Sequence, residues 1–81
     1  DVNTWEALRS MISSMLGYEW KNGVLAGNTP AEAFSVAVGL GSTMDADDIL
    51  NGLLRVRVRL RLSSPAEELE LDFAQLMAKS G

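Results

Sequence analysis

The 81-residue sequence contains no cysteine and no histidine, and both absences narrow what the protein can do. Without cysteine there are no disulfide bonds, no thiol nucleophile and none of the thiolates that commonly bind zinc. Without histidine the commonest acid–base residue and the commonest metal ligand are also missing. We therefore expect a protein that is not an enzyme and that has no catalytic site, no metal site and no cofactor.

Long apolar runs are missing as well, because no stretch of the sequence approaches the roughly 18 residues of a membrane-spanning helix. The sequence also shows no signal-peptide pattern. Its hydrophobic content of 47% is too high for a disordered tail, and its length suits one small domain with a modest core. We therefore interpret residues 1–81 as a single domain that does not insert into a membrane and that is stabilised by a partner chain.

Helical spacing is clearest near the start of the chain. Apolar residues three and four positions apart predict a helix from Asn3 to Trp20 with Asn3 as its N-cap. The stripe expected to be buried, in the core or at an interface, comprises Trp5, Leu8, Met11, Ile12, Met15 and Leu16. Two shorter helical turns are predicted, one after Thr29, where Glu32 completes a capping box, and one after Asp45.

Three segments alternate between large apolar residues and small or charged residues, which is the pattern of β-strands. They are Phe34–Val38, with large residues on one face and Ser/Ala on the other, Leu53–Leu62, and the segment that begins at Glu67. Together with the helices they predict an α+β fold. In this fold an N-terminal helix and short helices pack on a small mixed or antiparallel sheet, which strands from neighbouring subunits complete.

Two loop motifs invite a ligand-binding interpretation that their spacing does not support. The "GLGST" segment lacks the third glycine and the long following helix of a phosphate-binding loop, so a plain turn is expected. The acidic residues Asp45, Asp47 and Asp48 resemble half of a calcium-binding loop, but the required glycine and the closing glutamate are missing. Neither motif predicts a bound anion or metal ion.

The strand "LLRVRVRLRL" has an arginine at every second position, and the following "EELELDF" has an acid at every second position. The arginines are Arg55, Arg57, Arg59 and Arg61. Antiparallel pairing across Ser63–Ala66 would match the two series on both faces. The predicted pairs are Arg61–Glu68, Arg59–Glu70 and Arg57–Asp72 on one face, and Leu60–Leu69, Val58–Leu71 and Val56–Phe73 on the other. A slip of one residue would oppose arginine and leucine, so the register is strongly specified.

A row of arginines also suits a nucleic-acid backbone, which makes nucleic acid the rival partner. The net charge of −4 and the acidic series of matching spacing argue against that partner. We therefore expect no nucleic acid and an acidic protein strand instead. The charges leave open whether that strand comes from the same chain or from a neighbour, because either origin makes the same pairs.

Three segments follow one another from about Trp20 onward: "GVLAGNTPAEAF", "VAVGLGSTMDADDILNGLLRVRV" and "SPAEELELDF". Their order and spacing resemble the C-terminal domain of contractile tail sheath proteins over about two-thirds of the chain. These proteins occur in contractile-tailed bacteriophages, R-type pyocins and extracellular contractile injection systems. Two positions depart from the family pattern: Ser64 stands where many relatives carry a basic residue, and Leu69 where they carry an aromatic one.

The resemblance implies a structural role as the inner, tube-proximal part of a larger sheath subunit. It implies a homo-oligomeric helical sheath that assembles around an inner tube protein in the bacterial cytoplasm. The sheath, in a virion tail or an injection particle, then contracts to drive the tube through a target envelope. Residues 67–81 would include the exchanged C-terminal arm. The tube contact is expected at the first helix or at Asp45, Asp47 and Asp48. A monomeric α/β interaction module with a salt-bridged hairpin is the alternative.

Overall fold

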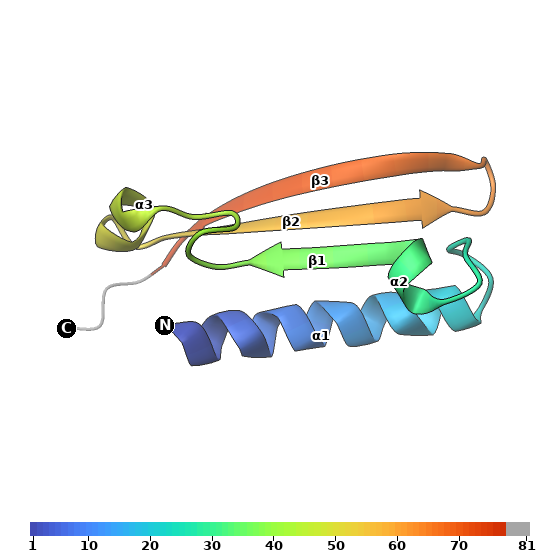
Figure 1. Ribbon diagram of the computed structural model, residues 1–81, viewed down its shortest axis with the longest axis horizontal. Coiled ribbons are helices and arrows are strands. Elements are labelled where there is room, and N and C mark those ends of the chain that lie inside the picture. The colour runs from blue at the N-terminus through green and yellow to red at the C-terminus, as the bar shows by residue number, and fades with distance from the viewer. Residues whose placement is uncertain (78–81) are drawn as a thin grey trace.

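The structure, a computed structural model, describes residues 1–77 and shows one long helix beside a three-stranded sheet (Figure 1). The helices and strands in chain order are α1 (Val2–Lys21), α2 (Pro30–Ala33), β1 (Phe34–Val38), α3 (Ala46–Leu50), β2 (Leu53–Leu62) and β3 (Glu67–Leu76). This arrangement is a small α+β fold, as the alternation of helical and strand periods predicts.

The sheet has the order β1-β2-β3, and both pairs of neighbouring strands are antiparallel. The central strand is therefore β2, the arginine-bearing strand, while β1 and β3 form the two edges. The β1 pairing sets Val36 opposite Val58 and Val38 opposite Val56. β3 continues three residues beyond Phe73 to Leu76, so the last strand is longer than the alternating acidic segment indicates.

The first helix has its N-cap two residues earlier than the sequence pattern predicts. Its N-cap is Asp1, whose carboxylate accepts a hydrogen bond from the Thr4 backbone amide at 3.0 Å. The predicted cap, Asn3, lies inside the helix, so that prediction was wrong. An N-cap needs only a side-chain acceptor placed before the first turn, and both residues have one.

The apolar stripe of α1 is narrower than predicted. Trp5, Leu8, Ile12 and Leu16 pack against the core, but Met11 and Met15 remain 56% and 62% exposed. These two methionines are therefore not part of the core of a single chain, and the interface alternative stays a prediction. Met11, Met15 and the exposed Tyr18 follow the spacing i, i+4, i+7 and form a second apolar flank of the helix. A single sheet contact buries only one side of a helix, and this flank lies outside it.

The short helices and the glycine loop form as local sequence rules predict. The Glu32 carboxylate accepts from the Thr29 amide at 3.0 Å, and Asp45 and Asp48 exchange reciprocal bonds of 2.9 and 3.1 Å at the start of α3. The "GLGST" segment is a turn in which the Gly39 carbonyl accepts from the backbone amides of Ser42, Thr43 and Met44.

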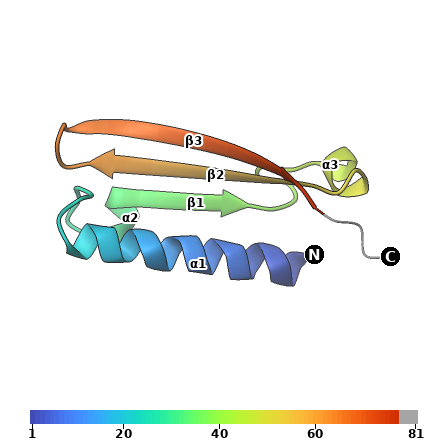
Figure 2. The same ribbon diagram turned by 180° about the vertical axis from the view of Figure 1, so that it is seen from behind.

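The core lies between α1 and the part of the sheet formed by β1 and β2. Its buried residues are Met44, Leu54, Val56 and Val58, and the apolar side chains of α1 and β1 surround them. Figures 1 and 2 show α1 running beside β1, with β3 on the far side of the sheet. Within residues 1–77, no helix is long and apolar enough to span a membrane.

Candidate functional site

The β2–β3 hairpin is the candidate site, and its register is the one that the charges predict. The structure pairs Arg61 with Glu68, Arg59 with Glu70 and Arg57 with Asp72. On the opposite face it pairs Leu60 with Leu69, Val58 with Leu71 and Val56 with Phe73. All six predicted cross-strand pairs are therefore present. They form within one chain, across the Ser63–Ala66 turn.

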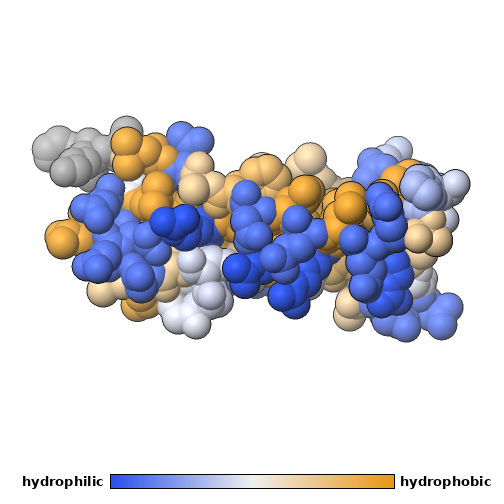
Figure 3. Space-filling view, turned by 90° about the horizontal axis from the view of Figure 1, so that it is seen from above, coloured by the Kyte–Doolittle hydropathy of each residue, from blue (hydrophilic) through white to orange (hydrophobic). Residues whose placement is uncertain are grey.

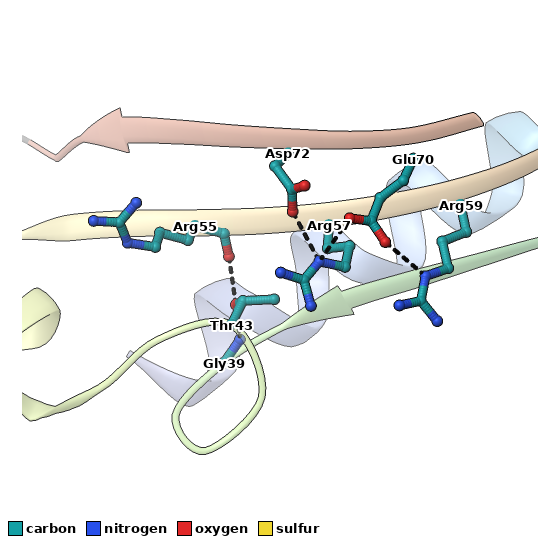
Figure 4. Close-up of polar contacts among 7 residues, drawn as sticks. All are labelled: Gly39, Thr43, Arg55, Arg57, Arg59, Glu70 and Asp72. Atoms are coloured by element: carbon teal, nitrogen blue, oxygen red, sulfur yellow. Dashed lines mark hydrogen bonds and ion pairs between the residues drawn. The ribbon is translucent and has the colours of Figure 1, made fainter.

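Each predicted charged pair makes a direct hydrogen bond. Arg57 Nε donates to Asp72 Oδ1 at 2.8 Å, and Arg59 Nε donates to Glu70 Oε1 at 2.9 Å (Figure 4). Arg61 Nη2 donates to Glu68 Oε1 at 3.0 Å. Glu70 also lies 3.8 Å from Arg57 Nε, so its carboxylate bridges two arginines. The result is a continuous row of ion pairs on a solvent-exposed face.

These contacts shift the pKa values of both partners in the Arg57–Asp72 pair. The hydrogen bond from Arg57 holds the pKa of the Asp72 carboxyl below its ordinary value. The same bond raises the pKa of the Arg57 guanidinium above its already high ordinary value. Both groups are exposed to water, which screens the attraction, so the row selects the register more than it stabilises the fold.

Arg55 does not join this row. Its cross-strand neighbour on β3 is Ala74, and its Nε donates instead to Asp48 Oδ1 of α3 at 3.2 Å. The Asp48 side chain is only 15% exposed. Its pKa lies below the ordinary value because the Asp45 amide donates to it and Arg55 adds a second favourable contact. The Arg55–Asp48 pair therefore ties α3 to the sheet, a contact that the sequence pattern does not reveal.

The three acids proposed as a tube contact lie together at the start of α3. Asp45 and Asp47 are exposed, whereas Asp48 is half-buried and engaged by Arg55. In the part of the chain that the structure describes, no cluster of three acidic side chains has the geometry to hold a metal ion. Within the described residues the Asp47 side chain makes no hydrogen bond, whereas the exposed Asp45 carboxylate already accepts a hydrogen bond from the Asp48 amide as the N-cap of α3.

The apolar face of the hairpin is divided between a covered and an uncovered half. Val56 and Val58 of β2 are buried beneath α1, but their β3 neighbours Phe73 and Leu71 are 55% and 39% exposed. Figure 3, viewed from the β3 side, shows an apolar band running beside the hydrophilic row. Large contiguous apolar patches often mark interaction sites, so this band is the candidate interaction surface of the hairpin.

Both edges of the sheet are open. Within residues 1–77, the outer edges of β1 and β3 make no backbone hydrogen bonds to another strand. An edge with free amides and carbonyls can pair with a strand of another chain. The candidate exchange arm, residues 67–81, coincides with β3 as far as Leu76, and residues 78–81 lie outside the described residues.

Sequence reasoning missed two groups of residues at this site. Thr43 donates through Oγ1 to the Arg55 carbonyl at 2.6 Å and accepts from the Gly39 amide, which fastens the glycine loop to β2 (Figure 4). Ser35 and Ala37 of β1 lie opposite Arg59 and Arg57 on the charged face. The small face of that strand was visible in the sequence, but its place beside the arginines depended on strand order.

Comparisons with known proteins add no further identification. The sequence matches no model of a known protein family, and no curated protein is similar enough to count as a relative. The geometry of the hairpin and the order of the sequence motifs are therefore the two observations that bear on function.

Proposed function

We propose that the chain is an assembly domain of a contractile tail sheath, a structural subunit with no catalytic role. In this proposal, copies polymerise into a helical sheath around an inner tube protein, and contraction of the sheath drives the tube through a target envelope. The order of sequence motifs supports the family. The observation that carries the assembly role is β3, an edge strand with a specified register and an uncovered apolar face.

Strand exchange follows naturally from this hairpin. Every ion pair and apolar pair between β2 and β3 forms equally well when β3 belongs to a neighbouring copy, because the pairing depends only on the two strand sequences. Only the Ser63–Ala66 connection must change course. Exchange of an identical element between copies is a low-cost route to linked subunits. The links persist while subunits rotate, as contraction of a continuous mesh requires.

The proposal also assigns the remaining surfaces. The exposed acids Asp45 and Asp47 at the start of α3, or the outer flank of α1, face the inner tube, whereas Asp48 is paired with Arg55. We propose that assembly takes place in the bacterial cytoplasm and that the mature particle is a virion tail or an injection particle. Nucleic acid and direct membrane insertion have no part in this role.

A second candidate is a monomeric interaction module with a salt-bridged hairpin. The observation that favours it is the closure of all six cross-strand pairs within one chain. Such a module needs no second copy for its β2–β3 pairing. It still has to account for Leu71 and Phe73, which remain exposed when the hairpin closes.

The deciding experiment mixes two charge-reversed chains. One carries Arg57→Glu with Arg59→Glu, which sets acids opposite Asp72 and Glu70, and the other carries Glu70→Arg with Asp72→Arg, which sets arginines opposite Arg59 and Arg57. Neither chain can pair its own strands without opposing like charges, but each can pair with the other. Exchange predicts that neither polymerises alone and that the mixture does, as measured by electron microscopy and sedimentation.

A chain that carries all four substitutions is the matched control, since its ion pairs are inverted but complete within one molecule. It should fold and polymerise like the parent chain. Assembly of the Arg57→Glu, Arg59→Glu chain alone, or a mixture that stays monomeric while the control polymerises, would contradict strand exchange. A parent chain that forms no helical tubes and stays monodisperse would favour the monomeric module.

A further inference from the structure

Arg57 and Arg59 use only part of their hydrogen-bonding capacity within the hairpin. Each donates to its carboxylate through Nε alone, although a guanidinium carries five N–H donors. Figure 4 shows the outer nitrogens of both side chains pointing away from β3 and lying over β1. Within residues 1–77 these nitrogens have no hydrogen-bond partner, and the two side chains remain 42% and 64% exposed.

The β1 residues beneath these nitrogens are the small ones of that strand. Ser35 lies opposite Arg59 and Ala37 lies opposite Arg57, while Val36 and Val38 point to the other face and pack in the core. A hollow of about 470 Å³, lined in part by Ser35 and Arg59, opens on the same charged side. Because Ser35 and Ala37 are short, nothing on β1 screens the guanidinium ends from the outer edge.

That outer edge can accept one more strand. No strand pairs with it in the described part of the chain, although the Phe34 amide at the start of β1 already donates to the Pro30 carbonyl. A strand added to this edge would lie about 5 Å beyond β1. The arginine side chains of β2 would extend over β1 from one side, and carboxylates of the added strand would extend over β1 from the other side. The two groups can then meet above Ser35 and Ala37. This geometry therefore fits an added strand that has acids at every second position.

We propose that the outer edge of β1 accepts an acidic strand in addition to the one on β2, and that this strand is β3 of another copy. The proposal extends the self-assembly proposed above. Glu68, Glu70 and Asp72 repeat at the two-residue spacing of the arginines, and β3 has a free outer edge. β1 and β3 both run antiparallel to β2, so a head-to-tail contact with aligned charged faces is parallel.

Charge favours this contact over the other ways of joining two sheets edge to edge. On the charged face of the head-to-tail sheet, the strands carry small residues (β1), arginines (β2) and acids (β3) in a repeating order. Each acidic row therefore has the arginines of its own copy on one side and, beyond the small residues of β1, the arginines of the next copy on the other. A β3–β3 contact would oppose acid to acid, which is destabilising, and a β1–β1 contact would oppose small residues and place no new acid beside an arginine. The head-to-tail contact is heterologous, so it propagates into a filament unless its rotation closes a ring.

The same contact accounts for the uncovered half of the apolar face. α1 packs along β1, so the α1 of the accepting copy would lie beside the β3 that the other copy supplies. Leu71 and Phe73, exposed in a single copy, would then approach a helix. In the continuous sheet, one helix for every three strands would cover the apolar face of β3, which the single helix of an isolated chain leaves uncovered.

The first test measures binding of a fluorescent peptide with the sequence of Glu67–Gln75, EELELDFAQ, to the ¹⁵N-labelled 81-residue protein. We expect saturable binding that weakens with added salt, and the largest amide shifts along Phe34–Val38. A peptide of the same composition with its alternation broken should bind at least about tenfold more weakly, because its acids and apolar residues no longer separate onto two faces.

The second test blocks the β1 edge without altering β2 or β3. Ser35→Glu with Ala37→Glu places carboxylates opposite Arg59 and Arg57, where they take up the outer nitrogens within one chain and repel an acidic strand. The thermal midpoint should not fall, whereas peptide affinity should fall at least about tenfold. Ser35→Gln with Ala37→Gln adds similar bulk without charge, and it should keep peptide affinity within about threefold of the parent chain.

The outcomes separate this proposal from the sheath function. Absence of peptide binding, equal affinity of the Glu and Gln variants, or shifts confined to Leu53–Leu62 would overturn the β1 site and leave strand exchange on β2 in place. Peptide bound at β1 to a chain that never self-assembles would keep a site for an acidic strand at β1, but it would overturn both the second copy as the occupant and the sheath function. Tighter binding of a single-stranded oligonucleotide than of the peptide would make phosphate the occupant and overturn the acidic-strand proposal.

Discussion

Two neighbouring rows of the same apolar face differ sharply in burial. Val56 and Val58 on β2 are 6% and 5% exposed, while Phe73 and Leu71, directly opposite them on β3, are 55% and 39% exposed. Both strands alternate in the same way, so their sequences alone do not separate them. The difference arises because the single long helix lies beside β1 and does not extend over β3. Alternation shows which face is apolar, and the number of helices decides how much of it is covered.

The largest expected effect comes from a matched pair of leucine truncations. Leu54→Ala removes a 7% exposed side chain from the core and should lower the free energy of unfolding by about 2–5 kcal/mol. Leu71→Ala on the uncovered row should lower it by less than about 1 kcal/mol. Urea denaturation followed by circular dichroism measures both, and loss of folded structure in Leu54→Ala agrees with the prediction.

Measuring both variants at low and at high protein concentration shows whether β3 is covered within one chain or by a second copy. If Leu71→Ala costs as much as Leu54→Ala at low concentration, where copies are separate, β3 is covered within one chain and the comparison between the two rows fails. If the cost of Leu71→Ala appears only at high concentration, a second copy supplies the cover.

A smaller effect tests the two flanks of α1. Leu16→Ala removes a core-facing, half-buried side chain and should lower the free energy of unfolding by about 1–2 kcal/mol, because partly buried truncations cost less than fully buried ones. Met15→Ala on the exposed flank should change it by no more than about 0.5 kcal/mol. Thermal unfolding of both variants at one protein concentration measures the difference. A reversed order would place the methionine flank, and not Leu16, against the sheet.

The smallest expected effect is the loss of thermal stability in acid that the charged face causes. Its direction follows from the lowered pKa of Asp72. Because Arg57 lowers the pKa of Asp72 in the folded chain, the contribution of this pair is complete above the ordinary carboxyl pKa of about 4. It is lost as the pH falls from there through the lower folded value. Thermal midpoints measured from pH 6 down to pH 2 should therefore fall, and Arg57→Gln should reduce the fall by at most about 5 °C.

The control for acidification is Arg9→Gln, which removes a cation that pairs with Glu6 on the surface of α1, far from the hairpin in sequence. Arg9 also lowers the pKa of Glu6, so this variant should reduce the acid sensitivity by a similar, small amount. A much larger reduction in Arg57→Gln than in Arg9→Gln would show that the charged row stabilises the fold as well as setting its register.

Local rules predicted much of this structure because they act over a few residues. Thr29 with Glu32 and Asp45 with Asp48 form their capping contacts within one turn, whatever the rest of the chain does. The β2–β3 register was also predictable, because two matched series separated by a short turn allow one alignment. The Arg55–Asp48 contact was not predictable, since it depends on where α3 sits beside the sheet.

The sequence by itself determined the register of the hairpin and the separation of its charged and apolar faces, because period-two alternation in both strands tolerates no slip. Only the tertiary structure decided which strand lies at the edge and which half of the apolar face stays bare. It also decided which small residues lie beside the arginines. These features depend on the order of the strands and on the one face that a single helix covers, and both are set by contacts between segments far apart in the chain.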